Sequence, residues 1–356
     1  MAAQRRRPTQ VDIARRLGIS QATVSLVVSG GPASFQVADE TRRAVLEAAA
    51  ELGYTVNAAA RSLKGGRNRM LGLYTFEPVF PVDRRDFYFP FLLGVEEATA
   101  ERGYDLLLFS SATARGDRSI YAGGANRLKV ADGCVLLGRH IDRAELAELV
   151  REDFPFVFIG RREVPGEELS YVAPDNVGAT RDVVRTLAGR GHRRLAYLKL
   201  ADDQEPTRDR AAGFRQGIAD AGIGEDQVLV HPMGEPDPVT GALLREWLAD
   251  GITAVLVEPS EDDAAIAAVE RAADEAGIRI PEDFSVVLLG DPPLSESTRD
   301  WTRYTPPREQ MAREAVRLLL ELLDDEEGRP RHLLLGCRPI AGETVAEPSS
   351  HAGRPS

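Results

Sequence analysis

Residues 9–29, TQVDIARRLGISQATVSLVVS, have the spacing of two short helices joined by a tight turn. Gly18 stands at the turn, where a residue without a Cβ adopts positive φ most easily. Ile19 closes the turn onto the core, and the hydroxyl of Ser20 can cap the second helix. Ala14 is small enough for the two helices to cross closely. The stretch therefore predicts a helix-turn-helix, a unit whose second helix enters the major groove of DNA.

The second helix of this unit has an inward and an outward face. Val24 and Val27 face inward at helical spacing. Gln21, on the outward face, is the leading candidate for base contact, because its amide can pair bidentately with adenine. Leu26 has two open interpretations, contact with a thymine methyl or plain exposure to solvent. From this unit we expect six residues to contact the bases or phosphates of DNA: Ser20, Gln21, Ala22, Thr23, Ser25 and Leu26.

Charge is distributed unevenly along the 356 residues, which carry a net charge of -12. Residues 1–69 contain 11 Lys and Arg against 5 Asp and Glu, a net of +6, and the remainder contains 33 against 51, a net of -18. A basic head on an acidic body fits a module that binds DNA and is joined to a body that repels it.

The composition is that of a soluble globular protein, which we expect in the cytoplasm. Cys134 and Cys337 lie far apart in apolar segments, which is typical of free thiols in a reducing compartment. No apolar run reaches the length of a membrane span. The start, MAAQRRRPTQ, has no apolar stretch after its basic residues and does not predict a secretory signal.

We predict five segments from the pattern of residues. A third helix is expected over residues 39–52 with Gly53 as its stop, and residues 57–64, NAAARSLK, form a small-residue helical patch. The predicted segments are a basic arm at 1–8, a helix-turn-helix domain at 9–56, a hinge helix and linker at 57–68, a body at 69–346 and a disordered tail at 347–356.

The body alternates short apolar strands with helices, and the first of these helices is expected over residues 91–101. Continuous apolar strands separated by helices imply parallel sheets that are covered on both faces. The strands are too many for one sheet of ordinary size, so we predict two doubly wound α/β lobes behind a small all-α head. The predicted strands are 71–76, 104–111, 133–138, 156–160, 195–200, 254–258 and 285–290.

An ordered set of motifs resembles the LacI/GalR family of bacterial transcription regulators over nearly the whole chain. The resemblance implies a homodimer, a body like that of periplasmic binding proteins and a small-molecule effector, a sugar or another metabolite, between its lobes. The motifs are DIARRLGISQATVSLVVSG (12–30), DETRRAVLEAAAELGY (39–54), NAAARSLKGG (57–66), FLLGVEEATAERGYDLLLFSS (91–111), ADGCVLLG (131–138), DNVGATRDVVRTLAGRGHRRLAYL (175–198), RDRAAGFRQGIADAGI (208–223), PEDFSVVLLGD (281–291) and PPREQMAREAVRLLLELL (306–323).

The expected DNA target is a near-palindromic operator in double-stranded DNA, because a dimer presents two recognition helices to successive major-groove turns. In the family, the hinge helices pair in the minor groove, and the resemblance makes Leu63 the residue that wedges between base steps. Asn57 and Arg61 are expected to position the head on phosphates. Val56 stands where the family usually has proline.

Candidate effector contacts follow the carboxyl ends of strands, where open α/β sheets bind ligands. Phe87 and Tyr88 are expected to precede the first helix of the body as an aromatic wall, with a core role for Phe87 as the alternative. The resemblance places Arg210 in the effector site, and Arg208 has an ion-pair role as its alternative. The full set is Phe87, Tyr88, Arg139, Arg161, Asp175, Arg208, Arg210, Glu258 and Asp291.

The pair Gly290-Asp291 departs from the family pattern, because many sugar-responsive relatives have two aspartates here. Either Asp291 takes over the contact, or the effector lacks the hydroxyl that the missing carboxylate would bind. Residues 86–91, DFYFPF, suit a sugar ring or a purine equally. Binding is expected to act allosterically, with a coupling of about 1–3 kcal/mol between effector and DNA.

Three other classes of function compete with a regulator. An enzyme is disfavoured, because the chain has no dinucleotide, P-loop, zincin or nucleophile-elbow motif, and we expect no cofactor and no metal. His192, in RGHRR, is interpreted as a turn residue and not as a base. A solute-binding protein without a transcriptional role and a weakly specific architectural DNA binder stay as alternatives.

Overall fold

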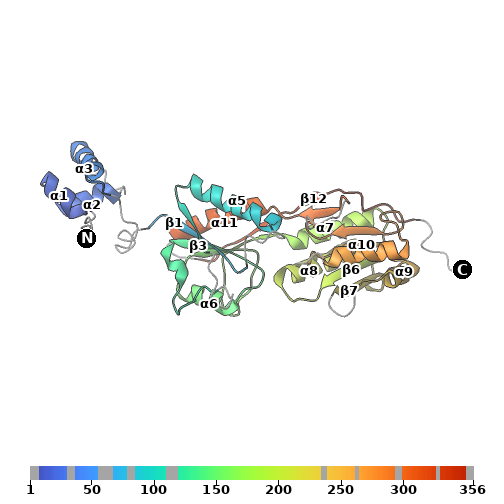
Figure 1. Cartoon of the computed structure of the whole chain (residues 1–356). Helices are drawn as coiled ribbons and strands as arrows, with labels where there is room; N and C mark the ends of the chain where they lie inside the picture. The colour runs from blue at the N-terminus through green and yellow to red at the C-terminus, as the bar shows by residue number, and fades with distance from the viewer. Residues whose placement is uncertain are drawn as a thin grey trace, which may run out of the picture. The chain divides into compact units, whose positions relative to one another are not determined.

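The computed structural model describes residues 8–29, 37–54, 67–77, 85–109, 119–233, 239–260, 264–292, 299–325 and 329–349. The chain divides into two compact units, Met1–Met70 and Leu71–Ser356 (Figure 1). The predicted body begins at 69, close to this division. Residues 1–7 of the predicted arm at 1–8 and residues 57–66 of the predicted hinge helix and linker at 57–68 lie outside the described residues, and so do residues 350–356 of the predicted tail.

The N-terminal unit contains the predicted helix-turn-helix. Gly18 has φ +66° and ends the first helix, and the Ser20 hydroxyl oxygen accepts a hydrogen bond from the Thr23 amide at 3.0 Å. The third helix matches its predicted bounds and ends at Gly53, again with a left-handed backbone. Seven residues form the buried core: Ile13, Ala14, Val24, Val27, Val45, Ala48 and Ala49. The helices are α1 (Gln10–Leu17), α2 (Gln21–Ser29) and α3 (Asp39–Leu52).

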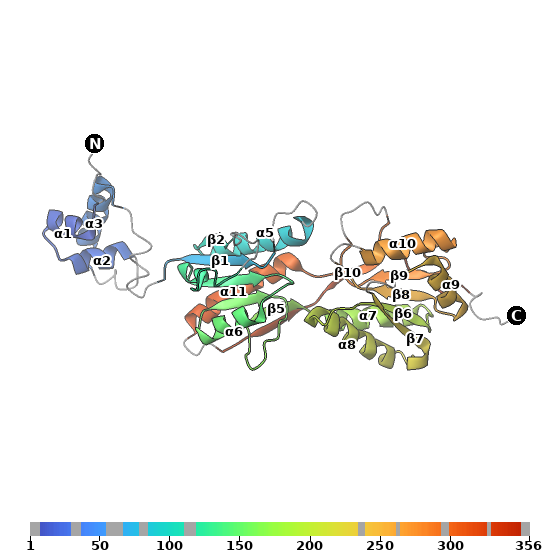
Figure 2. The same ribbon diagram turned by 60° about the horizontal axis from the view of Figure 1, so that its bottom comes forward.

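The second unit contains two six-stranded sheets, one in each of two lobes (Figures 1 and 2). The first sheet has the order β11-β5-β4-β3-β1-β2, and the second has the order β12-β10-β9-β8-β6-β7. The strands of the first sheet are β1 (Met70–Thr75), β2 (Asp105–Phe109), β3 (Gly133–Leu137), β4 (Phe156–Ile159), β5 (Tyr171–Pro174) and β11 (His332–Leu335). Those of the second are β6 (Leu195–Leu200), β7 (Val228–Met233), β8 (Ala254–Val257), β9 (Ser285–Leu288), β10 (Arg303–Thr305) and β12 (Arg338–Ile340).

The central strands pair in parallel, as their apolar runs predicted, because both faces of each sheet are covered. In β3, Val135 and Leu137 face one buried cluster and Cys134 and Leu136 face the other. All seven predicted strands are present within a few residues of their expected bounds. Five strands escaped prediction, namely β5, β7, β10, β11 and β12. Each is short, polar in part or interrupted by proline, as in VLVHPM of β7, and so lacks a continuous apolar run.

Helices flank both sheets. On the first lobe α5 packs beside α11, and on the second α7 packs beside α8 while α9 packs beside α10. Two short 3₁₀ turns, Arg127–Val130 and Glu225–Gln227, complete the regular structure of the described residues. The helices are α5 (Arg85–Glu101), α6 (Arg143–Arg151), α7 (Asn176–Gly189), α8 (Glu205–Asp220), α9 (Gly241–Ala249), α10 (Ala264–Ala276) and α11 (Arg308–Asp324).

Three crossovers join the two lobes. The chain leaves the first lobe after β5, returns after β10 and crosses again between β11 and β12. Of the described residues, those within 71–174 and 308–335 therefore form the first lobe, and those within 176–305 and 338–349 form the second. Helix α11 follows the second lobe in sequence but packs against α5 and the sheet of the first lobe.

The end of the described chain is held against the second lobe. The Ala346 carbonyl oxygen lies 2.9 Å from Nε2 of buried His192, whose Nδ1 lies 2.7 Å from the Thr253 hydroxyl. The Ala346 amide donates to the Ser285 hydroxyl at 3.1 Å. Residues 347–349 of the predicted tail are described, and Pro348 lies beside Gly191, so the expectation of disorder is wrong for these three residues.

The packing of α7 on α8 depends on Gly213. A Cβ at this position would lie 2.3 Å from the Val177 carbonyl oxygen. We expect Gly213→Ala to lower the free energy of unfolding by about 1–3 kcal/mol, because the helices must move apart. Gly189→Ala, in α7 with no atom near its new Cβ, is the control and is expected to be neutral or stabilising by about 0.5 kcal/mol. Urea unfolding followed by tryptophan fluorescence measures both, and equal midpoints would contradict the close approach.

Candidate functional site

Helix α2 presents a polar face opposite its buried valines. Gln21 and Ala22 are exposed, Leu26 is 39% exposed, and Thr23 and Ser25 are half-buried. These residues lie on one accessible side of the second helix, as the pattern predicted. The exposure of Leu26 is compatible with either of its two interpretations.

Gln21 is held by a residue that the sequence analysis missed. Its Nε2 donates a hydrogen bond to Oε1 of Gln10, at the start of α1, at 3.2 Å. Besides capping α2, the Ser20 hydroxyl bonds the Thr23 hydroxyl, with 2.8 Å between the two oxygens. The predicted DNA contacts Asn57, Arg61 and Leu63 lie outside the described residues.

Arg210 lies on the second lobe, anchored through one of its three nitrogens. Its Nε donates to the Tyr304 hydroxyl oxygen at 3.1 Å, and that hydroxyl donates to Oδ1 of Asn176 at 3.2 Å. In the part of the chain that the structure describes, the two terminal amino groups of Arg210 have no hydrogen-bond partner. The arrangement leaves a two-pronged donor for a ligand oxygen pair.

Glu258 sits beside this arginine and is fully buried. Its carboxylate accepts hydrogen bonds from the Tyr197 hydroxyl and, at 2.9 Å, from the Leu200 amide. Burial raises the pKa of Glu258, while the positive charge of Arg210 opposes the rise. The predicted site residue is therefore a fully buried carboxylate, close enough to Arg210 for the two charges to interact.

Asp291 joins elements from both lobes. Its carboxylate accepts from the Thr305 hydroxyl at 2.7 Å and pairs with Arg308 at 2.5 Å, and Arg303 lies 3.5 Å away. Arg308 begins α11 of the first lobe, and its guanidinium lies 5.0 Å from the centre of the Phe87 ring. Arg308 thus connects Asp291 to the ring of Phe87, and the carboxylate oxygens of Asp291 are already engaged.

The predicted position of the aromatic wall needs correction. Phe87 and Tyr88 lie inside α5, which begins at Arg85 and continues through Pro90 instead of starting at 91. The ring of Tyr88 is 1% exposed, and its hydroxyl donates to Glu77. Phe87 is 40% exposed and can serve as a wall, whereas Tyr88 is a core residue. Ring packing of Phe87 with Tyr88 and with Phe91 accompanies the extra turn at the start of α5.

A network of ion pairs connects the lobes around Glu205, at the start of α8. Its carboxylate, 1% exposed, accepts from Arg143 at 2.8 Å and from the Glu163 amide at 2.9 Å, and buried Arg162 lies 3.8 Å away. Burial disfavours the charged form, but the bonds from Arg143 and the Glu163 amide outweigh it, so the pKa of Glu205 is lowered.

Three predicted effector residues belong to this network. Arg161 pairs with Asp209 at 2.5 Å, Arg208 pairs with Glu163 at 2.6 Å, and Arg139 lies 4.0 Å from Asp202. The ion-pair alternative for Arg208 is thereby supported. A further predicted residue, Asp175, caps α7 by accepting from the Gly178 amide at 2.8 Å.

The partners that arrange these side chains were not predicted from the sequence. The sequence marks these residues only weakly, because each one bonds a residue that is distant in the chain. Arg308 belongs to the motif that begins PPREQM, and Asn176 belongs to the motif that begins DNVGAT. Both motifs were quoted for the resemblance, but neither residue was assigned a role. The missed residues are Gln10, Glu77, Asn176, Glu205, Tyr304 and Arg308.

Three further observations concern the described residues. No cluster of three or more His, Cys, Asp or Glu side chains among them is arranged to hold a metal ion. Within the same ranges, no helix is both long and apolar enough to cross a membrane. A small hollow of about 10 Å³ lies between Glu258 and Asp291, at the carboxyl ends of β8 and β9.

Two family models match the chain in the order of its units. Residues 9–57 match the bacterial regulatory proteins of the lacI family, and residues 184–345 match the periplasmic binding protein-like domain. The HTH-type transcriptional regulator CelR of Thermobifida fusca is 35% identical over 93% of this chain and 96% of its own. Catabolite control protein A of Streptococcus mutans is 28% identical over 92% of this chain and 95% of its own.

Solved structures give the same assignment. The complex of the transcriptional regulator CelR with cellobiose covers 95% of this chain and 100% of its own, at 30% identity and a TM-score of 0.61. The lac repressor dimer bound to operator and the anti-inducer ONPF covers 96% of this chain and 100% of its own. Its identity is 21% and its TM-score is 0.67, which shows a shared fold. A helix-turn-helix head, two parallel-sheet lobes and these relatives identify the chain as a DNA-binding transcriptional regulator of the lacI family.

Proposed function

We propose that this regulator binds a near-palindromic operator as a homodimer and that a small sugar, held between its lobes, sets its affinity for the operator. The observation that carries the first half is the face of α2, where Gln21 and Ala22 are exposed opposite buried Val24 and Val27. A helix so oriented offers amide and methyl groups to base edges in the major groove.

Selection from a random library of DNA duplexes, with the purified full-length chain at physiological salt, tests this half. Recovery of a near-palindrome supports a dimeric reader of sequence, and its half-site spacing reports the separation of the two heads. Enrichment of no sequence, with and without sugars present, contradicts it and favours an architectural DNA binder.

The side chain of Gln21 is expected to carry part of the specificity. Gln21→Ala removes the amide that pairs with a base and should cost about 1–3 kcal/mol, or about 5- to 150-fold, in affinity for the selected duplex. Affinity for unrelated DNA should stay unchanged, because phosphate contacts carry it. Fluorescence anisotropy at fixed salt measures both, and Gln216→Ala, exposed on α8, is the matched control. An equal loss on both duplexes would make Gln21 a phosphate contact.

The second half rests on Arg210 and its surroundings. Its terminal amino groups can donate to two vicinal hydroxyls, and the exposed ring of Phe87 can stack on the apolar face of a sugar ring. CelR, whose solved complex contains cellobiose, makes cellobiose the first compound to test. The engagement of Asp291 with Thr305 and Arg308 supports an effector that makes few carboxylate contacts here.

Isothermal titration of the full chain with cellobiose tests the sugar proposal separately from DNA binding. Saturable binding that changes operator affinity supports it. No binding by cellobiose or by related glucosides contradicts the sugar assignment and leaves the operator proposal untouched.

A further inference from the structure

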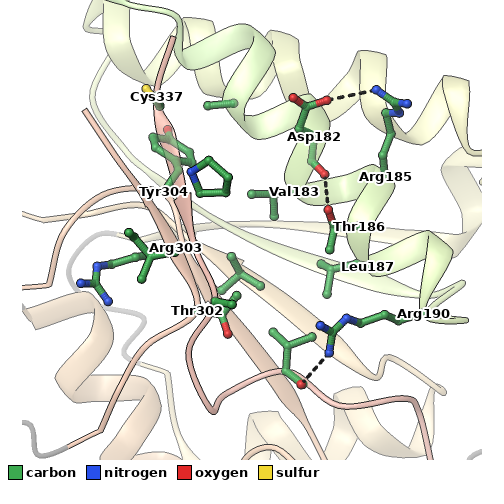
Figure 3. A pocket seen from close by; sticks show the side chains of 16 residues that line it. Asp182, Val183, Arg185, Thr186, Leu187, Arg190, Thr302, Arg303, Tyr304 and Cys337 are labelled. Carbon is green, nitrogen blue, oxygen red and sulfur yellow. Dashed lines mark hydrogen bonds and ion pairs between the residues drawn. The ribbon is translucent and has the colours of Figure 1, made fainter. Parts of the chain in front are cut away.

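A groove of about 570 Å³ lies on the second lobe, in the size range of small-molecule sites, and neither Glu258 nor Asp291 lines it (Figure 3). Helices α7 and α8 cover β6, β8 and β9 on this face of the sheet. Strands β10 and β12 prolong the sheet beyond α7, and the groove fills the angle between α7 and these strands.

The floor of the groove is apolar. Leu187, Val287 and Tyr304 form its deepest part and are each at most 2% exposed. Val183 of α7 and Ile340 of β12 line its sides. An apolar floor of this size favours a flat hydrocarbon or aromatic body.

The rim of the groove is positively charged. Its lining contains three arginines, Arg185, Arg190 and Arg303, against one carboxylate, Asp182. Asp182 pairs with Arg185 at 3.1 Å, and Arg303 lies 3.5 Å from Asp291 and from Asp300.

Arg190 differs from the other two arginines. Its Nη1 donates to the Val345 carbonyl at 3.0 Å, and it has no carboxylate within ion-pair distance among the described residues. Figure 3 shows its guanidinium among the lining side chains, joined by a dashed line to this carbonyl oxygen. A guanidinium with unused donors beside an apolar floor is suited to a carboxylate or sulfonate.

The groove also touches the lobe crossovers. Helix α7 begins directly after the first crossover, β10 leads into the second, and Cys337 lies in the third. The Tyr304 ring forms part of the floor, while its hydroxyl holds Arg210 at 3.1 Å. An occupant would therefore contact the same tyrosine that positions a predicted effector residue.

From this geometry we infer that the groove between α7, β10 and β12 is a second ligand site, which takes a flat apolar compound with one anionic group. The apolar body lies on Val287 and Tyr304, and the anion bonds Arg190. The site is separate from the one proposed for a sugar, and its test requires neither operator nor sugar.

The probe is 1-anilinonaphthalene-8-sulfonate, a fluorescent aromatic anion, titrated into the full-length chain at fixed ionic strength. We expect one saturable site per chain. Ala341→Trp, at the exposed rim, fills the groove and should abolish that site. Arg190→Gln should weaken binding about tenfold by removing a charge-assisted bond. Arg215→Gln, the same charge change on the exposed face of α8, should leave binding unchanged.

The variants also provide the results that would overturn the inference. The site is refuted if the wild-type chain shows no saturable binding, or if Ala341→Trp and Arg190→Gln both bind as the wild type does. A change of molar mass by light scattering in Ala341→Trp would instead make the groove a contact between copies of the chain. Because Arg190→Gln adds no bulk, it keeps the test valid if the tryptophan variant fails to fold.

Discussion

Glu205→Gln is expected to lower the thermal midpoint of the unit Leu71–Ser356 by about 6 °C, equivalent to about 3 kcal/mol. Glutamine can still accept from the Glu163 amide, but it removes the negative charge beside Arg143 and buried Arg162. An uncompensated charge in a buried position is costly, and here the loss falls on a contact between the lobes. Fluorescence of Trp247 and Trp301, the two tryptophans of the chain, reports the midpoint for this unit.

The effect of this substitution should depend on pH. The folded pKa of Glu205 lies below its ordinary value of 4.5. A carboxyl group with a lowered pKa contributes stability above the unfolded value and loses it as the pH falls through the folded value. The difference between wild type and variant should therefore be complete at pH 7 and shrink below pH 4.5.

Glu163→Gln is the matched control, because Glu163 pairs with Arg208 in the same network while its side chain is 50% exposed. We expect a loss within about 1 kcal/mol, as for other solvent-exposed pairs. Equal midpoints for Glu205→Gln and the wild type at pH 7 would show that the buried pair contributes nothing to the joint between the lobes.

Arg210→Ala is expected to weaken cellobiose binding by about 10- to 100-fold and to abolish the response of operator binding to the sugar. The substitution removes both unused donors of the guanidinium, whereas the head that binds DNA is unchanged. Titration calorimetry measures the sugar affinity, and anisotropy with a selected operator measures DNA binding. Normal release or gain of operator in the variant would place the effector elsewhere.

Two companion variants separate binding from folding in this test. Arg210→Lys keeps a positive charge beside buried Glu258 but lacks the two-pronged donor, so it should lose sugar affinity with little loss of stability. Arg215→Ala makes the same truncation on the exposed face of α8 and should change neither quantity. A stable Arg210→Lys protein with wild-type affinity would contradict the fork geometry.

The elements that local sequence specifies were predicted closely. Gly18, Ser20 and Gly53 lie at the turn, cap and stop that their residue types favour, and the third helix has its predicted bounds. The buried strands were found because two covered faces require continuous apolar runs. Edge strands such as β7 and β12 were missed, since solvent on one side permits polar residues and proline.

The candidate site was predicted in part. The sequence could mark three residues of the site, because Glu258 and Asp291 follow predicted strands and Arg210 belongs to a family motif. It could not show that Arg210 is held by Tyr304, 94 residues away, or that Asp291 meets Arg308 of the other lobe. Such pairs form only because the crossovers bring segments that are distant in sequence back to the same or the neighbouring lobe.

Residue types and spacing alone therefore determine the helix-turn-helix, the two doubly wound lobes and the membership of the family. They do so because turns, caps and covered strands depend on residues within a few positions of one another. Tertiary structure alone decides that Tyr88 is buried, that Glu205 joins the lobes and that a groove opens beside α7. Those outcomes depend on contacts between residues far apart in the chain, which no local pattern encodes.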